Sequence, residues 1–268
     1  MSPWLELCRA AAADILRVLE ELPTRSEREP VLATGVGGDE TTAIDEAAER
    51  AVVARLEALH VEGHEFLLVS EELGERAFGT SETRVIVDPI DGSVNAKRGL
   101  RHFCLSVAVS EGPVFGDIVF GYLYDFGSGE EWTATRGGGA QLDGRPLGAV
   151  RPKDTVEILA LEGTLSASVA DKAVPLTGYA RRFRIMGSLA LALCQLAAGR
   201  LDAVCSLKEA RAVDVAAAQL VVRECGIPIG FADAAPWDAA RLGTAPHSLV
   251  VAAPTEELRD RLAEILVM

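Results

Sequence analysis

The sequence predicts an α/β protein built of layered sheets and helices, and the order of its apolar patterns supports that fold class. Apolar residues recur at helical spacing in the first 60 residues, whereas residues 66–135 contain several strand-like runs in succession. Further along the chain, helical and strand-like stretches alternate. Helices, then neighbouring strands, then alternating elements favour stacked layers over a simple alternating barrel.

Each element follows from its local pattern. Apolar periodicity predicts helices at residues 4–21, 43–59, 188–198, 215–225 and 256–266. Strand-like runs lie at residues 66–69, 85–87, 103–109, 118–124, 131–135 and around 156–160. Gly138-Gly139 and Asp143-Gly144 are typical of hairpin turns. A stretch rich in Gly, Pro and charge at 147–154 predicts a boundary between an N-terminal half, residues 1–150, and a C-terminal half, residues 151–268.

Composition narrows the functional classes. The 268 residues are 49% hydrophobic, which is enough for a substantial core, and no apolar stretch approaches the roughly 20 residues of a membrane span. The net charge of −14 would repel a nucleic-acid backbone. Because the first residues also lack the pattern of a secretory signal, we expect a cytoplasmic protein that binds neither nucleic acid nor membrane. Five scattered cysteines predict buried free thiols.

The strongest chemical signal is the octamer Asp88-Pro89-Ile90-Asp91-Gly92-Ser93-Val94-Asn95, which directly follows an apolar strand. The proline fixes the backbone so that Asp88 and Asp91 can converge, and Gly92-Ser93 can present N–H groups to a phosphate. Two carboxylates at the end of an apolar strand are costly unless they are paired or bound to a metal. The octamer therefore predicts a cation site.

Further carboxylates can complete this site. Glu71 and Glu72 follow the strand at 66–69, and Asp214 stands at the start of the helix predicted from residue 215. Magnesium prefers near-octahedral oxygen coordination, so carboxylates from separate strand and helix ends suit it. Taken singly, Glu71-Glu72 could be a surface pair, Asp214 a helix cap and Asp45 a first-turn helix acid. The octamer favours the metal-binding interpretation for all of them.

The octamer matches throughout the signature of the inositol monophosphatase superfamily, and residues 36–230 resemble that family. Further matching motifs occur in the family's order: Ser70-Glu71-Glu72, Gly137-Gly138-Gly139-Ala140 with Asp143-Gly144, and Val213-Asp214-Val215-Ala216-Ala217 ending in Glu224-Cys225-Gly226. The resemblance implies an α-β-α-β-α sandwich of the sugar-phosphatase type, with an active site between the halves. It also implies a homodimer.

The resemblance further implies roles for single residues. Two or three magnesium ions would be bound by Glu71, Asp88, the carbonyl of Ile90, Asp91 and Asp214. Asp45 and Ser93 would orient the attacking water, and Glu72 would hold a further metal-bound water. The expected substrate contacts are Asp91, Gly92, Ser93, Gly187 and Ser188, together with the cationic candidates Arg182, Arg184, Lys208 and Arg211.

The implied activity is magnesium-dependent hydrolysis of a small phosphorylated sugar or polyol by a metal-activated water. Residues 181–203 resemble the archaeal and bacterial branch, some members of which act on both fructose 1,6-bisphosphate and inositol 1-phosphate. Leu207 stands where animal members carry a glutamate that contacts inositol, which argues against strict inositol specificity. The sequence leaves open a phosphatase for 3′-phosphoadenosine 5′-phosphate or histidinol phosphate, and a metal-binding regulatory protein of the same fold.

Overall fold

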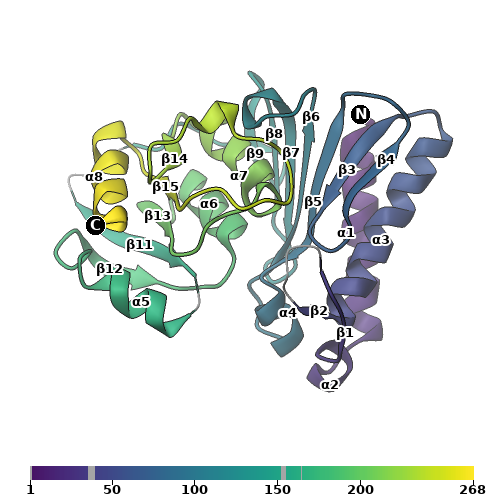
Figure 1. The fold of residues 1–268 in the computed structure, drawn as a ribbon, viewed down its shortest axis with the longest axis horizontal. Coiled ribbons are helices and arrows are strands. Elements are labelled where there is room, and N and C mark those ends of the chain that lie inside the picture. The colour runs from purple at the N-terminus through teal and green to yellow at the C-terminus, as the bar shows by residue number, and fades with distance from the viewer. Residues whose placement is uncertain (1, 36–39, 152–154, 164) are drawn as a thin grey trace.

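The computed structural model describes residues 2–35, 40–151, 155–163 and 165–268, which fold as layers of helix, sheet, helix, sheet and helix (Figure 1). This order is the predicted α-β-α-β-α sandwich, so the predicted fold class is confirmed. The layers are formed by α1 (Pro3–Glu21) with α3 (Ala43–Val61), the first large sheet, α6 (Leu189–Ala197) with α7 (Ala212–Glu224), the second large sheet, and α5 (Ser166–Ala173) with α8 (Glu256–Val267).

The first large sheet contains eight strands among the described residues, in the order β10-β9-β8-β7-β6-β5-β3-β4. The strands are β3 (Phe66–Ser70), β4 (Gly74–Phe78), β5 (Arg84–Asp91), β6 (Cys104–Ser110), β7 (Ile118–Asp125), β8 (Glu131–Thr135), β9 (Gly139–Leu142) and β10 (Arg145–Pro146). β3 and β5 run parallel, with Ser70 opposite Val87. Because parallel strands end at the same edge, the residues after Ser70 lie beside Asp88.

The second large sheet contains five strands within the described ranges, in the order β12-β11-β13-β15-β14. Its strands are β11 (Val156–Glu162), β12 (Ala180–Arg184), β13 (Ala203–Ser206), β14 (Ile229–Phe231) and β15 (Val250–Ala252). The smaller elements are α2 (Arg25–Arg28), β1 (Val31–Thr34), β2 (Glu40–Thr42), α4 (Ser93–Arg98) and the 3-10 turns η1 (Phe115–Asp117) and η2 (Trp237–Ala239).

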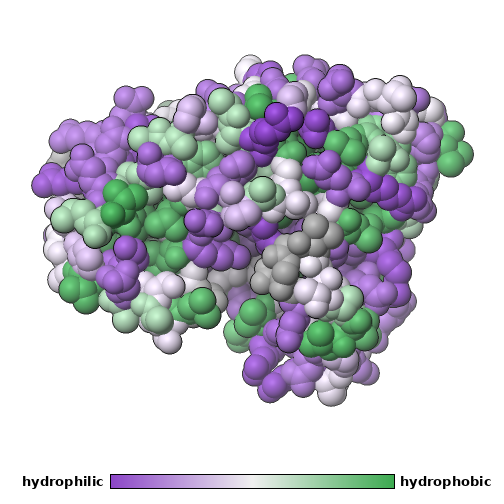
Figure 2. Space-filling model, viewed as in Figure 1, coloured by the Kyte–Doolittle hydropathy of each residue, from purple (hydrophilic) through white to green (hydrophobic). Residues whose placement is uncertain are grey.

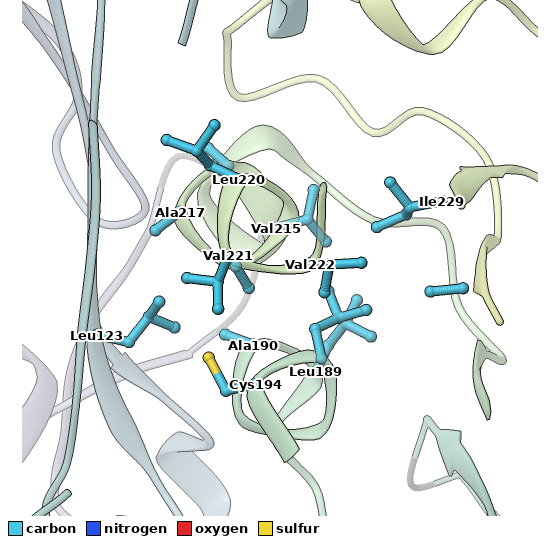
Figure 3. Close-up of a cluster of buried hydrophobic side chains, with 14 of the residues drawn as sticks. Leu123, Leu189, Ala190, Cys194, Val215, Ala217, Leu220, Val221, Val222 and Ile229 are labelled. Atoms are coloured by element: carbon cyan, nitrogen blue, oxygen red, sulfur yellow. The ribbon is translucent and has the colours of Figure 1, made fainter. Parts of the chain in front are cut away.

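Helices α6 and α7 fill the space between the two large sheets. Their apolar side chains meet Leu123 of β7 on one side and Ile229 of β14 on the other (Figure 3). Gly121 of β7 permits this packing, because a Cβ there would lie 2.7 Å from the carbonyl oxygen of Ala217. One apolar core therefore extends across both sheets. The division at residue 150 stays a prediction, and residues 152–154 of the predicted seam lie outside the described residues.

The two predicted hairpin turns are confirmed. Asp143 and Gly144, both with positive φ, connect β9 to β10. The glycine turn between β8 and β9 is held by Glu224 in the last turn of α7, which accepts N–H bonds from Gly137 and Gly139, each at 2.8 Å. The N–H groups of Gly137 and Gly139 are thus bonded to the carboxylate of Glu224, so they are not arranged to bind a phosphate.

The predicted helices and strands are all present, with ends that shift by a few residues. The strand predicted at 85–87 continues to Asp91 in β5, and α7 begins at Ala212 rather than at residue 215, so that Asp214 lies inside its first turn. All five cysteines are buried and free, as predicted. Among the described residues, every helix is too short or too polar to span a membrane.

Candidate active site

A cavity of about 500 Å³ opens between α4 and α5, where Figure 2 shows the outline of the molecule notched. It brings together predicted site residues from both halves of the chain: Asp45, Glu71, Glu72, Asp88, Ile90, Asp91, Gly92, Ser93, Gly187, Lys208, Arg211 and Asp214. A larger cavity of about 940 Å³ lies between β12 and α8, and none of the predicted catalytic, metal-binding or substrate-binding residues lines it. The chemistry of the sequence motifs therefore points to the smaller cavity.

The end of β5 carries the two aspartates on a bulge. Asp88 lies opposite Ser106 of β6 and Asp91 opposite Cys104, so Pro89 and Ile90 together face a single residue. The backbone N–H of Ile90 donates to Asp88 Oδ1 at 3.0 Å. An extra residue on one strand bends that strand locally and re-aims its side chains. The bulge explains how both carboxylates reach one cavity from a continuous strand.

Asp45 in the first turn of α3 and Glu72 after β3 line the same cavity. The N–H and hydroxyl of Thr42 donate to Asp45 Oδ2 at 3.0 and 2.5 Å, while Oδ1 is buried without a hydrogen-bond partner among the described residues. The hydroxyl of Thr41 donates to Glu72. Both carboxylates are therefore oriented by threonines, and Asp45 keeps one oxygen available for a donor from the cavity.

Asp214 is held by the start of α7. Its Oδ2 accepts the backbone N–H of Arg211 at 2.7 Å, as an acid in the first helical turn does in a capping box. The guanidinium of Arg211 lies between two carboxylates, with Nη2 bonded to Glu71 and 3.3 Å from Asp214 Oδ1. Arg211 therefore caps α7 through its backbone N–H and pairs with the acidic cluster through its side chain.

The cluster of Glu71, Asp88, Asp91 and Asp214 carries more negative than positive charge, because four carboxylates face three cationic side chains among the described lining residues, namely Lys97, Lys208 and Arg211. Burial and repulsion from neighbouring carboxylates raise the pKa of Asp88 well above its ordinary value. Burial likewise raises the pKa of Glu71, and that of Asp91 to about 7. A divalent cation would offset this charge.

The donor set fits magnesium, since it consists of carboxylate oxygens and the carbonyl of Ile90 rather than thiolates or imidazoles. In the described part of the chain, however, no three acidic, histidine or cysteine side chains are grouped as a ready-made metal cage. Instead, the guanidinium of Arg211 lies among the carboxylates. The residues therefore supply ligand types that suit magnesium, and Arg211 is at present bonded to two of them.

Two structural residues join the octamer to the C-terminal half. Asn95 Nδ2 donates to the carbonyls of His102 and Met186, at 2.8 and 2.7 Å. Gly92 has φ 98° and lies so close to the carbonyl of Gly187 that a Cβ would be 3.2 Å from that oxygen. The last residues of the octamer therefore fix the loop that follows β12 against β5.

Sequence reasoning missed two buried glutamates. Glu162 accepts the N–H of Gly187 at 2.8 Å and holds the loop that lines the cavity; burial raises its pKa to about 7. Glu49 lies one turn after Asp45, accepts the hydroxyl of Ser70 at 2.5 Å, and also has a pKa raised to about 7 by burial. An acid at the end of an apolar strand was the available signal for Glu162, which is the last residue of β11, as Glu71 is the first residue after β3.

The four cationic candidates separate into two pairs. Lys208 and Arg211 line the cavity. Arg182 and Arg184 are exposed on β12 and do not line it; Arg182 pairs with Glu157 at 3.0 Å. A substrate contact for this second pair stays a prediction.

Known proteins share both this fold and these motifs. A fructose-1,6-bisphosphatase/inositol-1-monophosphatase of Methanothermobacter thermautotrophicus is 27% identical over 274 residues, covering 98% of this chain and 96% of that protein. The Nus factor SuhB of Escherichia coli is 31% identical over 241 residues, which cover 85% of this chain and 85% of that protein. A solved structure of an inositol monophosphatase-fructose 1,6 bisphosphatase matches with a TM-score of 0.85 at 27% identity, over 99% of this chain and 100% of that one.

The match extends well beyond the motifs. The model of the inositol monophosphatase family covers residues 2–267. The resemblance first noted over residues 36–230 therefore holds for nearly the whole chain, and the fold matches that of the solved structure. The chain belongs to the inositol monophosphatase family of phosphoric monoester hydrolases.

Proposed function

We propose that the protein is a magnesium-dependent phosphatase that acts on a small phosphorylated sugar or polyol, namely inositol 1-phosphate, fructose 1,6-bisphosphate or both. The observation that carries this proposal is the convergence of Glu71, Asp88, Asp91 and Asp214 in one cavity with Lys208 and Arg211. The names of the archaeal relative and of the solved structure support the substrate class.

Magnesium would be held by Glu71, Asp88, Asp91, Asp214 and the carbonyl of Ile90. When bound, magnesium lowers the pKa of a water molecule and offsets the negative charge of the phosphate. Around it, Ser93 and Asp45 orient the attacking water, and Asp45 has a free oxygen to accept a proton from it. Glu72, fixed by Thr41, orients a second water.

Substrate recognition falls to the rest of the cavity wall. Gly92 and Ser93 line the cavity at the start of α4, where their backbone N–H groups would bind phosphate oxygens. Gly187 would contact the sugar or polyol, whereas Ser188, predicted from the sequence as a second contact, is buried outside the cavity lining and donates its hydroxyl to Asp91 instead. Lys208 and Arg211 supply positive charge for a phosphate within a protein whose net charge is −14.

A second candidate function is regulatory, because a relative with 31% identity is named a Nus factor. In that case, the same fold and cavity would act through a macromolecular partner. We further propose a cytoplasmic homodimer, as family resemblance implies.

The test measures phosphate release by the purified protein from inositol 1-phosphate, fructose 1,6-bisphosphate, 3′-phosphoadenosine 5′-phosphate and histidinol phosphate, with magnesium or with excess EDTA. We expect release that requires magnesium and that falls at least a hundredfold in Asp88→Asn. Asp238→Asn, which removes an exposed acid paired with Arg223, is the matched control. A folded protein that releases no phosphate from any of the four would contradict the proposal and favour the regulatory alternative.

A further inference from the structure

Arg211 places a buried guanidinium among the carboxylates that we assign to the metal. The residue is 8% exposed, and its Nη2 contacts Glu71 as well as Asp214, at 3.3 Å from Asp214 Oδ1. Its own backbone N–H binds the other carboxylate oxygen of Asp214 at 2.7 Å. The arginine is thereby the nearest cation to two proposed metal ligands from opposite halves of the chain.

A metal and this guanidinium compete for the same oxygens. A divalent cation that Glu71 and Asp214 both coordinate would use the lone pairs that Nη2 now engages, and the two positive charges would repel each other. The backbone of Arg211 is fixed by the start of α7, but its side chain is long and flexible. Displacement therefore moves the guanidinium while leaving the helix in place.

The cavity offers a second position for the displaced group. Arg211 and Lys208 both line it from the segment between β13 and α7, and Ser93 at the start of α4 lines the same cavity. A planar guanidinium matches the oxygens of a phosphate in a bidentate manner. A phosphate bound beside the metal would therefore give the arginine a new partner in place of the carboxylates.

We propose that Arg211 is an internal counter-cation of the acidic cluster, which magnesium displaces from Glu71 and Asp214 and which then binds the phosphate of the substrate. This proposal rests on the proposed function, because it assumes that the cluster binds magnesium. It makes metal loading and phosphate binding interdependent through one side chain: the arginine opposes the first and supports the second.

The arrangement predicts opposite effects of one substitution on two ligands. Arg211→Met keeps most of the side-chain volume and removes the charge. Magnesium should then bind on the order of tenfold more tightly, because it no longer displaces a bound cation, and a tenfold change corresponds to about 1.4 kcal/mol. Inorganic phosphate, added at saturating magnesium, should bind on the order of tenfold more weakly. A residue with only a structural role would weaken both.

The test uses titration calorimetry of the full chain, first with magnesium after EDTA treatment and dialysis, then with inorganic phosphate at saturating magnesium. Arg211→Gln provides a second neutral variant that can still hydrogen-bond the carboxylates if Arg211→Met does not fold. Arg223→Met, which removes an exposed ion pair at the other end of α7, should change neither affinity.

The outcomes separate the two proposals. If the wild-type protein binds no magnesium, the proposed function fails. If the wild-type protein binds magnesium but neither neutral variant binds it more tightly, the counter-cation proposal is overturned while the proposed function survives. If the phosphate affinity is unchanged in both variants, then Arg211 does not bind the phosphate, and that part of the proposal is overturned.

Discussion

The side-chain hydroxyl of Ser188 donates a hydrogen bond of 2.5 Å to Asp91, although the two residues lie 97 positions apart in the chain. The backbone N–H of Ala190 donates to the same carboxylate oxygen at 2.9 Å. One aspartate at the end of β5 is therefore bound by the first turn of α6, where a negative charge is favoured by the helix dipole. The orientation of the Asp91 carboxylate, a proposed metal ligand, is therefore set by residues of the C-terminal half.

Ser188→Ala should destabilise the protein and weaken magnesium binding. The substitution removes the bond to Asp91 and the helix cap, in which Ser188 accepts the N–H of Leu191 at 3.2 Å. The expected loss is about 1–2 kcal/mol of unfolding free energy, measured by urea denaturation. Thr255→Ala removes a comparable cap from α8, far from the cavity, and should lower stability without changing magnesium affinity. Equal magnesium affinities in the two variants would contradict this role for Ser188.

Gly92→Ala should be much more destabilising than Gly99→Ala, although both glycines have positive φ at the ends of the same short helix. At Gly92 the new Cβ would lie 3.1 Å from the carbonyl oxygen of His102 and 3.2 Å from that of Gly187, whereas Gly99 has open space. We expect about 1 kcal/mol at Gly99 from backbone strain alone and about 3 kcal/mol at Gly92. Thermal unfolding of both variants measures the difference, and equal losses would refute the close approach at Gly92.

Glu49 predicts a pH dependence of stability. Burial raises its pKa from 4.5 to about 7, so its stabilising contribution is complete below pH 4.5 and is lost as the pH rises through 7. The loss amounts to about 3 kcal/mol, because one pKa unit corresponds to about 1.36 kcal/mol. Glu49→Gln should therefore lose less stability than the wild-type protein between pH 5 and pH 8.

Urea denaturation in EDTA at the two pH values measures this difference, since EDTA keeps metal binding from altering the titration. Glu57→Gln removes an exposed glutamate from the same helix and should leave the wild-type pH dependence unchanged. If Glu49→Gln and the wild-type protein lose equal stability, then the pKa of Glu49 is not raised in the folded protein.

The parts of the fold and site that depend on residues close together in the sequence could be predicted from the sequence. Asp88 and Glu71 each follow an apolar strand, and their positions relative to those strands are local properties. That β3 and β5 are adjacent and parallel follows from neither run alone, yet it is what places Glu71 beside Asp88. The octamer motif supplied this tertiary information through family resemblance.

Several of the missed features depend on contacts between distant segments or on very short elements. Strands β13, β14 and β15 have only three or four residues, too few for a periodic pattern. The start of α7 was placed too late because Asp214 resembles an N-cap, whereas it lies three residues into a capping box. The contact of Arg211 with Glu71, 140 positions away, has no local signal at all.

Helix α7 joins the acidic cluster at its first turn to the glycine turn of the first sheet at its last turn. Asp214 lies in its first turn, while Glu224 in its last turn holds the N–H groups of Gly137 and Gly139. The thirteen residues of α7 span about 20 Å, so the glycine turn is bound at the opposite end of the helix from Asp214. Because α7 is also packed along its length against α6 and the first sheet, the bonds at its last turn add to the packing that positions Asp214.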